Sequence, residues 1–393
     1  MASTTSPALL RDHGAPAIHN HLKVVHLTVH PPYYNRLFVK TCRTLAAAGY
    51  RVVLVAPHER DETTDDIEVR AVPEPRSRPA RFGLTSLRVY RRALAERGAL
   101  YHFHDPALIP FGLLLRLTGR PVIYDVYEDY VTALYLVPYL PMGLGRIAGR
   151  LFGLFERMAS RAFAIVIAER YYGRKFARST PVLNYPRLEG FAALETLRRS
   201  WPKDRIRLLY TGNLSFDRGA LNLVAVLNRL GDDAELSVVG RCWEDEAAAM
   251  HRAAAKPERL HLVGVGSTFL PFSRILESYR EPWTAALALF QDTPHSREKE
   301  ITKLFEYMAA GLPIVCSHFP VWRELVEGNG CGICVDPEDP EAVARAVRWL
   351  HAHPEEAARM GEAGRRAVAE RYNWDKAAEN LLGLYRHLLG ESR

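Results

Sequence analysis

The sequence lacks the long hydrophobic runs and the cysteine patterns that define several protein classes. No stretch of about 18 uncharged apolar residues occurs, so no membrane-spanning helix is expected, and no signal-peptide core is seen. Five cysteines in 393 residues form no disulfide framework, which favours a cytoplasmic location. Cys331 and Cys334 make a C-x-x-C without a second pair at zinc-ligand spacing. We interpret them as small residues of a strand at 332–335.

Signals for other ligands are also missing. Gly264 and Gly266 begin a dinucleotide fingerprint, but Phe269 stands where the third glycine is needed, so NAD is not expected. The acidic runs at 232–233 and 244–246 fall at expected turns or helix starts, where carboxylates cap N–H groups, and no metal is required. The balance of 52 Lys and Arg against 45 Asp and Glu is only mildly basic. It suits anionic small molecules or an acidic membrane surface and gives no argument for nucleic acid.

The length and the pattern of apolar residues predict two domains of α/β type. A chain of 393 residues exceeds the size of one typical core, and strand-like runs alternate with helical patterns in both halves. In the first half, strands are expected at 22–29, 51–56 and 165–167, with two more whose polar ends lie at 102–106 and 123–129. In the second half they are expected at 206–211, 235–239, 261–263, 285–290 and 313–316. Segments 340–350 and 354–389 are expected to be helical.

We divide the chain accordingly. Residues 1–20 are expected to form a flexible leader, residues 21–195 a first doubly wound, Rossmann-like domain, and residues 203–375 a second one. Residues 376–393 are expected to form a C-terminal helix that packs back on the first domain.

The stretch 291–317 holds the most informative pattern. Glu298 and Glu306 have seven residues between them, and the helix that carries Glu306 is expected to stop at Gly311, with Pro313 just beyond. The apolar run 314–316 then predicts a buried parallel strand. A polar loop, a helix start and a carboxylate thus meet at the carboxyl edge of a sheet, where backbone N–H groups and the helix dipole favour anions.

The Glu298-x7-Glu306 spacing, together with FEYMAAGLPIV at 305–315, resembles the retaining group 1 (GT4-like) glycosyltransferases of the GT-B fold. The resemblance implies two Rossmann-like domains that face a cleft, with the acceptor in the first and the donor nucleotide sugar in the second. It places Glu298 near the donor sugar and phosphates and Glu306 on the ribose hydroxyls. It implies that the diphosphate is held by the backbone amides of Lys299, Glu300, Ile301 and Thr302.

A second donor loop follows the strand 206–211. Where the family has a glycine-bounded loop with two cations that grip the diphosphate, this chain has Gly212, Asn213 and Arg218. Arg218 matches the second cation, whereas Asn213 replaces the first. Lys303 is a candidate for the missing charge, since an ammonium group makes a serviceable phosphate contact. The alternative for Lys303 is a helix-surface lysine that pairs with a neighbour.

The acceptor side is expected on loops of the first domain. At 28–32 the chain has two prolines that cannot donate backbone hydrogen bonds, so those positions hold no phosphate. Candidate acceptor-side residues are His30, Asn35, Arg36, Asp105 and Glu128, and Arg36 could equally be a solvated helix residue.

Two strand ends resemble family motifs that lie beside the transferred sugar. The first, HDP, contains His104, and the second, DVYED, has Tyr127 where the family commonly has His. A phenol with a reference pKa of about 10 cannot mimic imidazole at neutral pH, so His104 is the alternative for a His-dependent step. His104 could also be an ordinary hydrogen-bonded residue at a strand end.

The implied reaction transfers a sugar from a nucleotide diphosphate, UDP by family preference, to a hydroxyl acceptor with retention at the anomeric carbon. No cofactor or metal is expected. Arg218, Lys303 and helix amides would meet the charge on the leaving diphosphate. The expected catalytic residues are Glu298, Arg218, Lys303, Tyr127 and His104. Two other functions stay open: a non-catalytic partner protein that binds a nucleotide sugar, and a nucleotide-sugar epimerase of the same architecture.

One stretch suggests a membrane. Residues 140–178 carry eight Lys and Arg against two Glu, and Arg146, Arg150 and Arg157 recur at near-helical spacing among leucines and phenylalanines. Such a helix could lie on the inner face of an anionic membrane. The apolar residues could equally pack into the first domain and leave the arginines solvated or lining an acceptor cleft.

Overall fold

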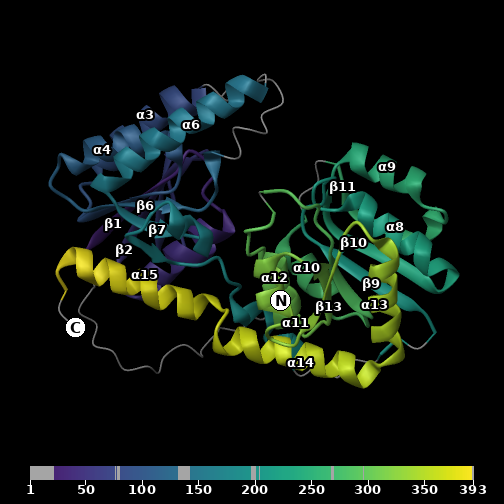
Figure 1. Ribbon diagram of the computed structural model, residues 1–393. Helices are drawn as coiled ribbons and strands as arrows, with labels where there is room; N and C mark the ends of the chain where they lie inside the picture. The colour runs from purple at the N-terminus through teal and green to yellow at the C-terminus, as the bar shows by residue number, and fades with distance from the viewer. Residues whose placement is uncertain are drawn as a thin grey trace, which may run out of the picture. The chain divides into compact units, whose positions relative to one another are not determined.

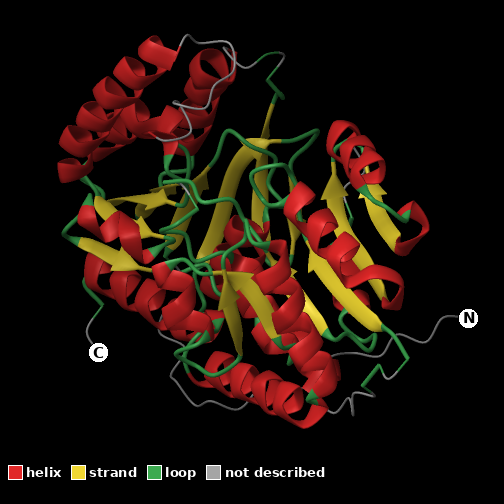
Figure 2. Ribbon diagram, turned by 45° about the vertical axis from the view of Figure 1, so that its right-hand side comes forward, coloured by secondary structure: helices red, strands yellow, loops and turns green. Residues whose placement is uncertain are grey.

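The computed structural model describes residues 22–391 except 76, 78–79, 132–141, 196–200, 203, 267–269 and 295. The expected leader and most of the expected linker lie outside these residues, and the predicted domain boundary stays a prediction. The described chain contains two β-sheets, each with helices on both faces (Figures 1 and 2). It divides into two compact units. The first comprises the residues up to Asp125, Phe155–Ile165 and the residues from Leu384 on, and the second comprises Val126–Leu154 and Val166–Gly383.

The first sheet has eight strands in the order β3-β4-β2-β1-β5-β6-β7-β8. Pairing is parallel from β4 through β2, β1 and β5 to β6, and the edge strand β3 is antiparallel. Buried valine, leucine and phenylalanine fill β1, β2 and β5, as expected for parallel strands covered on both faces. The strands are β1 Lys23–Leu27, β2 Arg51–Pro57, β3 Glu62–Thr64, β4 Ile67–Val72, β5 Leu100–Phe103, β6 Val122–Val126, β7 Ala164–Ile167 and β8 Ser179–Pro181.

The second sheet has six strands in the order β11-β10-β9-β12-β13-β14, and every pair is parallel. In sequence rank this is 3-2-1-4-5-6, the order of a doubly wound Rossmann sheet. The strands are β9 Ile206–Thr211, β10 Ala234–Cys242, β11 Leu260–Val265, β12 Ala285–Ala288, β13 Ile314–Ser317 and β14 Gly332–Val335. The strands expected from the sequence are therefore confirmed, with shifted ends, and β3, β4 and β8 are additional.

Helices connect these strands. Those of the first half are a π-helical turn at Asn35–Cys42, α1 Arg43–Ala47, α3 Ser86–Ala95, α4 Ile109–Arg116 and α6 Met142–Ala159. Those that follow are α7 Ala192–Glu195, α8 Ala220–Leu230, α9 Glu244–Ala253, α10 Phe272–Ser278, α11 Thr302–Ala310, α12 Pro320–Val326, α13 Pro340–Ala352, α14 Pro354–Glu370 and α15 Trp374–Leu389. Helices formed by the described residues are all too short or too polar to cross a bilayer.

Two helix ends test the sequence expectations. The helix α11 ends as predicted at Gly311, which has a positive φ of 68° and accepts the left-handed cap conformation. The segment 354–389 is helical as expected, and it is divided into α14, which ends at Glu370, and a separate final helix α15, which begins at Trp374. The side chain of Asn373 explains the break. Its amide donates to the carbonyls of Val368 and Ala369, and its carbonyl oxygen accepts from the N–H of Lys376, so it caps both helices.

Candidate active site

The second sheet has its topological switch point between β9 and β12, the strands from which the chain winds in opposite directions. Loops that follow such a pair form the usual ligand crevice of an open α/β sheet. Here they are 212–219 after β9 and 289–301 after β12, and the N–H of Gln291 donates to the carbonyl of Asp217 at 3.0 Å. The two loops predicted to hold the donor are thus directly joined.

The loop after β9 depends on two glycines. Gly212 has a φ of 86°, and Gly219, at the start of α8, has a φ of 87°. A Cβ on Gly219 would stand 1.8 Å from the carbonyl oxygen of Leu289, so only glycine lets the two loops approach this closely. Between them, the carbonyl oxygen of Asn213 accepts from the hydroxyl of Tyr210 at 2.8 Å and from the guanidinium of Arg218 at 3.1 Å. Arg218 is therefore held over this loop.

The loop after β12 leads into α11, whose first residue is Thr302. The carbonyl of Lys299 accepts from the indole N–H of Trp322 at 2.7 Å, and the hydroxyl of Thr302 accepts from the amide of Asn184 at 3.3 Å. Ile301 precedes the helix in an extended conformation, and no side chain caps the helix start. The first turn of α11 therefore offers backbone N–H groups at the switch point.

Glu306, in the second turn of α11, is held by a group of buried hydroxyls. Its carboxylate accepts from the hydroxyl of Tyr279 at 3.2 Å, and that hydroxyl also lies 3.0 Å from the hydroxyl of Thr211 at the end of β9. The neighbouring Tyr307 accepts from the backbone N–H of Thr211 at 2.9 Å. These contacts fix Glu306 relative to the end of β9.

Lys303 is buried, with 9% of its surface exposed, so its interpretation as a helix-surface lysine is wrong. Its ammonium lies 3.5 Å from the centre of the Tyr210 ring and has no hydrogen-bond partner among the described residues. Burial lowers the pKa of Lys303 well below its usual range, Arg218 lowers it further, and Glu306 opposes both effects. Arg218 and Glu306 are therefore each within electrostatic reach of Lys303.

Sequence reasoning missed three residues that contact the loop 289–301 after β12, called the donor loop below because it is predicted to hold the donor. They belong to the segment 169–174, directly after β7, and the signal was available because polar residues at the end of a parallel strand often face a site. The carboxylate of Glu169 accepts from the backbone N–H of Glu300 at 3.1 Å, and Arg170 pairs with the side chain of Glu300 at 3.1 Å. Arg174 pairs with Glu298 at 2.8 Å. Burial raises the pKa of Glu300, and Arg170 offsets part of this rise.

The first sheet has its own switch point between β1 and β5, where Asp105 organises the loop after β1. The Asp105 carboxylate accepts from the hydroxyl of Thr28 at 2.7 Å and from the N–H of Val29 at 2.9 Å, and it lies 3.1 Å from Nε2 of His30. Burial alone would raise the pKa of Asp105, but His30 and these donors lower it below its ordinary value. His30 and Asp105, both predicted on the acceptor side, are thus brought together.

Arg36 is tied to the neighbouring strand end and is only 11% exposed in its side chain, so it is no solvated helix residue. Its guanidinium grips both oxygens of Asp125, at 3.0 and 2.7 Å. The same carboxylate lies 3.1 Å from Nδ1 of His104. Burial alone would raise the pKa of Asp125, but Arg36 and His104 lower it well below its usual range.

A buried chain of hydrogen bonds continues from His104. Its Nε2 lies 3.0 Å from Nδ1 of His26, whose Nε2 is 3.2 Å from the hydroxyl of Tyr385, and this hydroxyl is 2.8 Å from Nδ1 of His102. A hydroxyl has a single proton, so it donates to one imidazole and accepts from the other. Each of the three imidazoles places a nitrogen within 4.8 Å of the others, and Nε2 of His102 is buried without a hydrogen-bond partner among the described residues. His104 therefore matches its interpretation as a hydrogen-bonded strand-end residue.

The remaining predicted residues of this group lie nearer the surface. Tyr127 is half-buried and accepts a hydrogen bond from the hydroxyl of Tyr130 at 2.9 Å. Asn35 and Glu128 are exposed.

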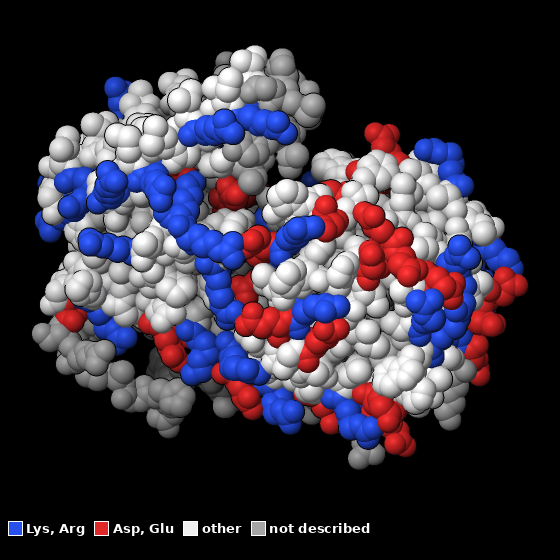
Figure 3. Space-filling view, viewed as in Figure 1, with Lys and Arg blue, Asp and Glu red and all other residues white. Residues whose placement is uncertain are grey.

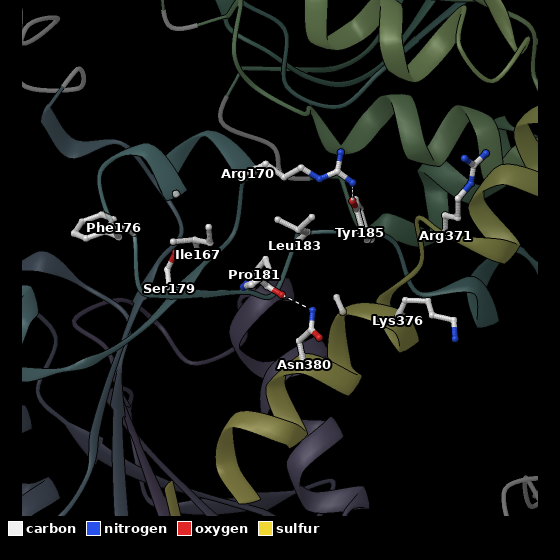
Figure 4. Close-up of a pocket in the computed structure, with 13 residues that line it drawn as sticks. Ile167, Arg170, Phe176, Ser179, Pro181, Leu183, Tyr185, Arg371, Lys376 and Asn380 are labelled. Atoms are coloured by element: carbon white, nitrogen blue, oxygen red, sulfur yellow. Dashed lines mark hydrogen bonds between the residues drawn. The ribbon is translucent and has the colours of Figure 1, made fainter. Parts of the chain in front are cut away.

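A separate hollow of about 560 Å³ lies beside the segment 167–185 and the start of α15 (Figure 4). The predicted site residues are absent from its lining. Arg170, which lines it and donates to the hydroxyl of Tyr185 at 2.9 Å, also pairs with Glu300 of the donor loop. This arginine therefore connects the hollow with the donor loop.

Comparison with known proteins places this site in a family. The model of the family "Glycosyl transferases group 1" matches residues 195–367, and the model "Glycosyl transferase 4-like domain" matches residues 34–181. The chain belongs to the group 1 glycosyltransferases.

Two relatives show how similar this chain is to known glycosyltransferases. D-inositol 3-phosphate glycosyltransferase of Xylanimonas cellulosilytica is 28% identical over 189 residues, which are 48% of this chain and 44% of the relative. The match therefore spans less than half of that protein. Alpha-D-kanosaminyltransferase of Streptomyces kanamyceticus is 24% identical over 327 residues, 77% of this chain and 81% of the relative.

Solved structures identify the fold as GT-B. Sucrose-phosphate synthase from Thermosynechococcus elongatus superposes with a TM-score of 0.73 at 18% identity and covers 95% of this chain and 100% of its own. The Anabaena protein HepE in complex with UDP-glucose superposes with a TM-score of 0.69 at 11% identity and covers 93% of this chain and 100% of its own. At these identities the likeness extends to the fold alone.

Proposed function

We propose that the protein transfers a sugar from a nucleotide diphosphate sugar, with UDP as the nucleotide, to a hydroxyl group of an acceptor. The observation that carries the proposal is the group formed by Arg218, Lys303 and Glu306 around the first turns of α11, at the switch point of the second sheet. The guanidinium of Arg218, the amine of Lys303 and open helix N–H groups suit a diphosphate, and the carboxylate of Glu306 in the second turn of α11 suits the ribose hydroxyls. The choice of UDP follows the family preference that the motif from Glu298 to Val315 implies.

In the proposed reaction the bond between the anomeric carbon and the diphosphate breaks as the acceptor hydroxyl attacks the same face of the sugar, and the hydroxyl proton passes to an oxygen of the leaving diphosphate, so the anomeric configuration is retained. Negative charge grows on the leaving diphosphate in the transition state. Arg218 and the amides of the α11 turn would stabilise that charge from fixed positions, which lowers the barrier without a covalent intermediate. Glu298 would contact the sugar after its pairing with Arg174 is released.

On the first sheet we propose that Asp105 and Asp125 hold other side chains in position and do not react with the substrates themselves. Asp105 fixes the loop that carries His30, and Asp125 fixes Arg36, so these two basic side chains are presented by buried carboxylates. We assign the acceptor to this side of the protein, with His30 and Arg36 as its contacts. Tyr127 would contribute a hydrogen bond.

The test is a panel of UDP-sugars and GDP-sugars incubated with the purified protein, in which nucleotide diphosphate release is read with and without candidate hydroxyl acceptors. Release that requires an acceptor, and a product whose anomeric proton coupling matches the donor, would support the proposal. Unchanged rates in excess EDTA would support metal independence. Binding of a nucleotide sugar without release would favour the non-catalytic partner protein, and conversion of the free donor would favour the epimerase.

A further inference from the structure

The outer face of α6 is the most apolar exposed surface that a single described helix presents. Five large side chains on it recur at spacings of three and four residues, which places them in one stripe along the helix. Each is more than half exposed. They are Leu144, Ile147, Leu151, Leu154 and Met158.

The inner face of the same helix carries mostly small and polar groups, with Phe152 partly buried among them. Gly145, Gly149, Glu156 and Ala159 are buried, and the carboxylate of Glu156 accepts from the hydroxyl of Tyr124 at 2.6 Å. A surface helix of a globular protein normally turns its apolar stripe inward and its polar residues outward. The helix α6 does the reverse. The interpretation in which its leucines pack into the first domain is therefore wrong.

The charges on α6 are also divided between its faces. Arg146, Arg150 and Arg157 are exposed and follow one flank of the stripe, and Arg161 continues this flank just after the helix. The acid of the helix, Glu156, is on the buried face. Along α6, Figure 3 shows Lys and Arg side chains among uncharged atoms. The exposed face of residues 144–159 is thus apolar and cationic.

We propose that this face of α6 binds the surface of an anionic lipid bilayer. The apolar stripe would enter the boundary between headgroups and acyl chains, and the arginines on its flank would lie at the level of the lipid phosphates. Because the described helices are unable to cross a bilayer, the contact would be peripheral.

A second copy of the protein is the competing occupant, since spacings of three and four also suit a coiled coil. In that packing Arg150 and Arg157 would take flanking positions that normally pair with acidic residues of the partner helix. The exposed face of α6 between residues 144 and 159 offers no acid. Charge complementarity therefore favours phosphate groups over self-pairing.

The experiment is sedimentation of the full chain with vesicles of phosphatidylcholine and phosphatidylglycerol, and with vesicles of phosphatidylcholine alone. Wild type should pellet with the anionic vesicles at low salt, and binding should fall at least about tenfold at high salt or without the anionic lipid. R146Q/R150Q/R157Q should weaken binding on the order of a hundredfold, because each cation near an anionic leaflet contributes about a factor of five. I147S/L151S/L154S should weaken it comparably while leaving the charge unchanged.

A matched control is R323Q/R345Q/R359Q, which removes three arginines whose side chains are at least 54% exposed on other helices. It should bind vesicles like wild type. Circular dichroism would verify that all variants are folded, which their exposed positions favour.

The proposal is overturned if wild type stays in the supernatant at low salt, or if the control loses as much binding as the α6 variants. A dimer in sedimentation equilibrium that I147S/L151S/L154S abolishes would assign the face to self-association instead. None of these readouts depends on transferase activity.

Discussion

The carboxylate of Glu169 accepts a hydrogen bond of 3.1 Å from the backbone N–H of Glu300, although 131 residues separate them in sequence. That N–H is one of the amides predicted to hold the donor diphosphate. An internal carboxylate therefore occupies a position that an anionic ligand would take. Arg170 and Arg174 bind the flanking side chains of the same loop.

Replacing this carboxylate should favour the donor. We expect Glu169→Gln to bind UDP about three- to tenfold more tightly, because the amide no longer has a charged internal partner and one negative charge near the anion is removed. Isothermal titration calorimetry measures the change. Glu189→Gln, at a side chain that is 66% exposed, is the control and should match wild type. Weaker binding by Glu169→Gln would mean that Glu169 supports the loop instead.

Arg218 should matter more for turnover than for binding. Its charge would meet the diphosphate most strongly as it leaves, so Arg218→Ala should lower kcat at least about tenfold more than it weakens donor affinity. The comparison needs initial rates and calorimetry on the same preparations, with Arg323→Ala as the exposed control. Equal losses in kcat and affinity would indicate plain ground-state binding.

Glu306 should act on donor affinity alone. Glu306→Ala removes a charged hydrogen-bond acceptor, a loss of roughly 1.5 to 3 kcal/mol, so UDP should bind at least about tenfold more weakly while the fold survives. Tyr279→Phe removes the hydroxyl that holds Glu306 and should give a smaller loss in the same direction. Unchanged affinity in Glu306→Ala would contradict the ribose contact.

Donor binding should be coupled to proton uptake by Lys303. Burial and Arg218 lower the pKa of this ammonium, and an arriving diphosphate supplies negative charge that raises the pKa again. The apparent binding enthalpy of UDP near pH 8 should therefore vary with the ionisation enthalpy of the buffer. Lys303→Met should abolish this dependence. An enthalpy that is identical in phosphate and Tris buffers for the wild type would refute the coupling.

The hydrogen-bond chain through His26, His102 and Tyr385 should make stability depend on pH. Burial lowers the pKa values of His26 and His102 well below their usual range, so these residues take up protons mainly when the protein unfolds. Their contribution to the free energy of unfolding is fully present above the pKa of about 6.5 that histidine has in the unfolded chain. It is lost as the pH falls below that value. Urea unfolding should therefore give a lower free energy of unfolding at pH 5.5 than at pH 7.5.

A second variant tests the hydroxyl within that chain. Tyr385→Phe leaves two imidazole nitrogens without their partner in the core and should cost about 1 to 3 kcal/mol of the free energy of unfolding at pH 7.5. Tyr34→Phe, at a side chain that is 54% exposed, should cost almost nothing. A loss in Tyr385→Phe no larger than in this control would show that water replaces the hydroxyl.

The sequence patterns of single strands and helix ends predicted the fold well, because each pattern is set by residues that are close together in the chain. The apolar runs of β9, β12 and β13 and the glycine that ends α11 need only a few residues to be recognised. The residue at which the helical segment 354–389 divides was not specified, because an asparagine side chain can cap a helix or sit within one. The backbone partners of Asn373 in α14 decide which.

Contacts between distant segments could not be predicted in the same way. Arg174 and Glu298 are 124 residues apart, and no spacing rule connects them. The burial of Lys303 depends on the rings of Tyr210 and Phe290, which come from β9 and from the loop after β12. Side chains of these lengths reach a partner only after the sheet order has placed their strands side by side.

The sequence by itself determined the alternation of strands and helices, the family motif from Glu298 to Val315 and the presence of a cationic amphipathic segment at 140–178. Only the tertiary structure decided which side of α6 meets the protein, since periodicity defines an apolar stripe but not its direction. The tertiary structure also placed Glu169 on the donor loop and tied Arg36 to Asp125. These contacts depend on which distant side chains have matching charge and shape once the chain has folded. The local preference of a residue for helix or strand does not decide between two distant partners.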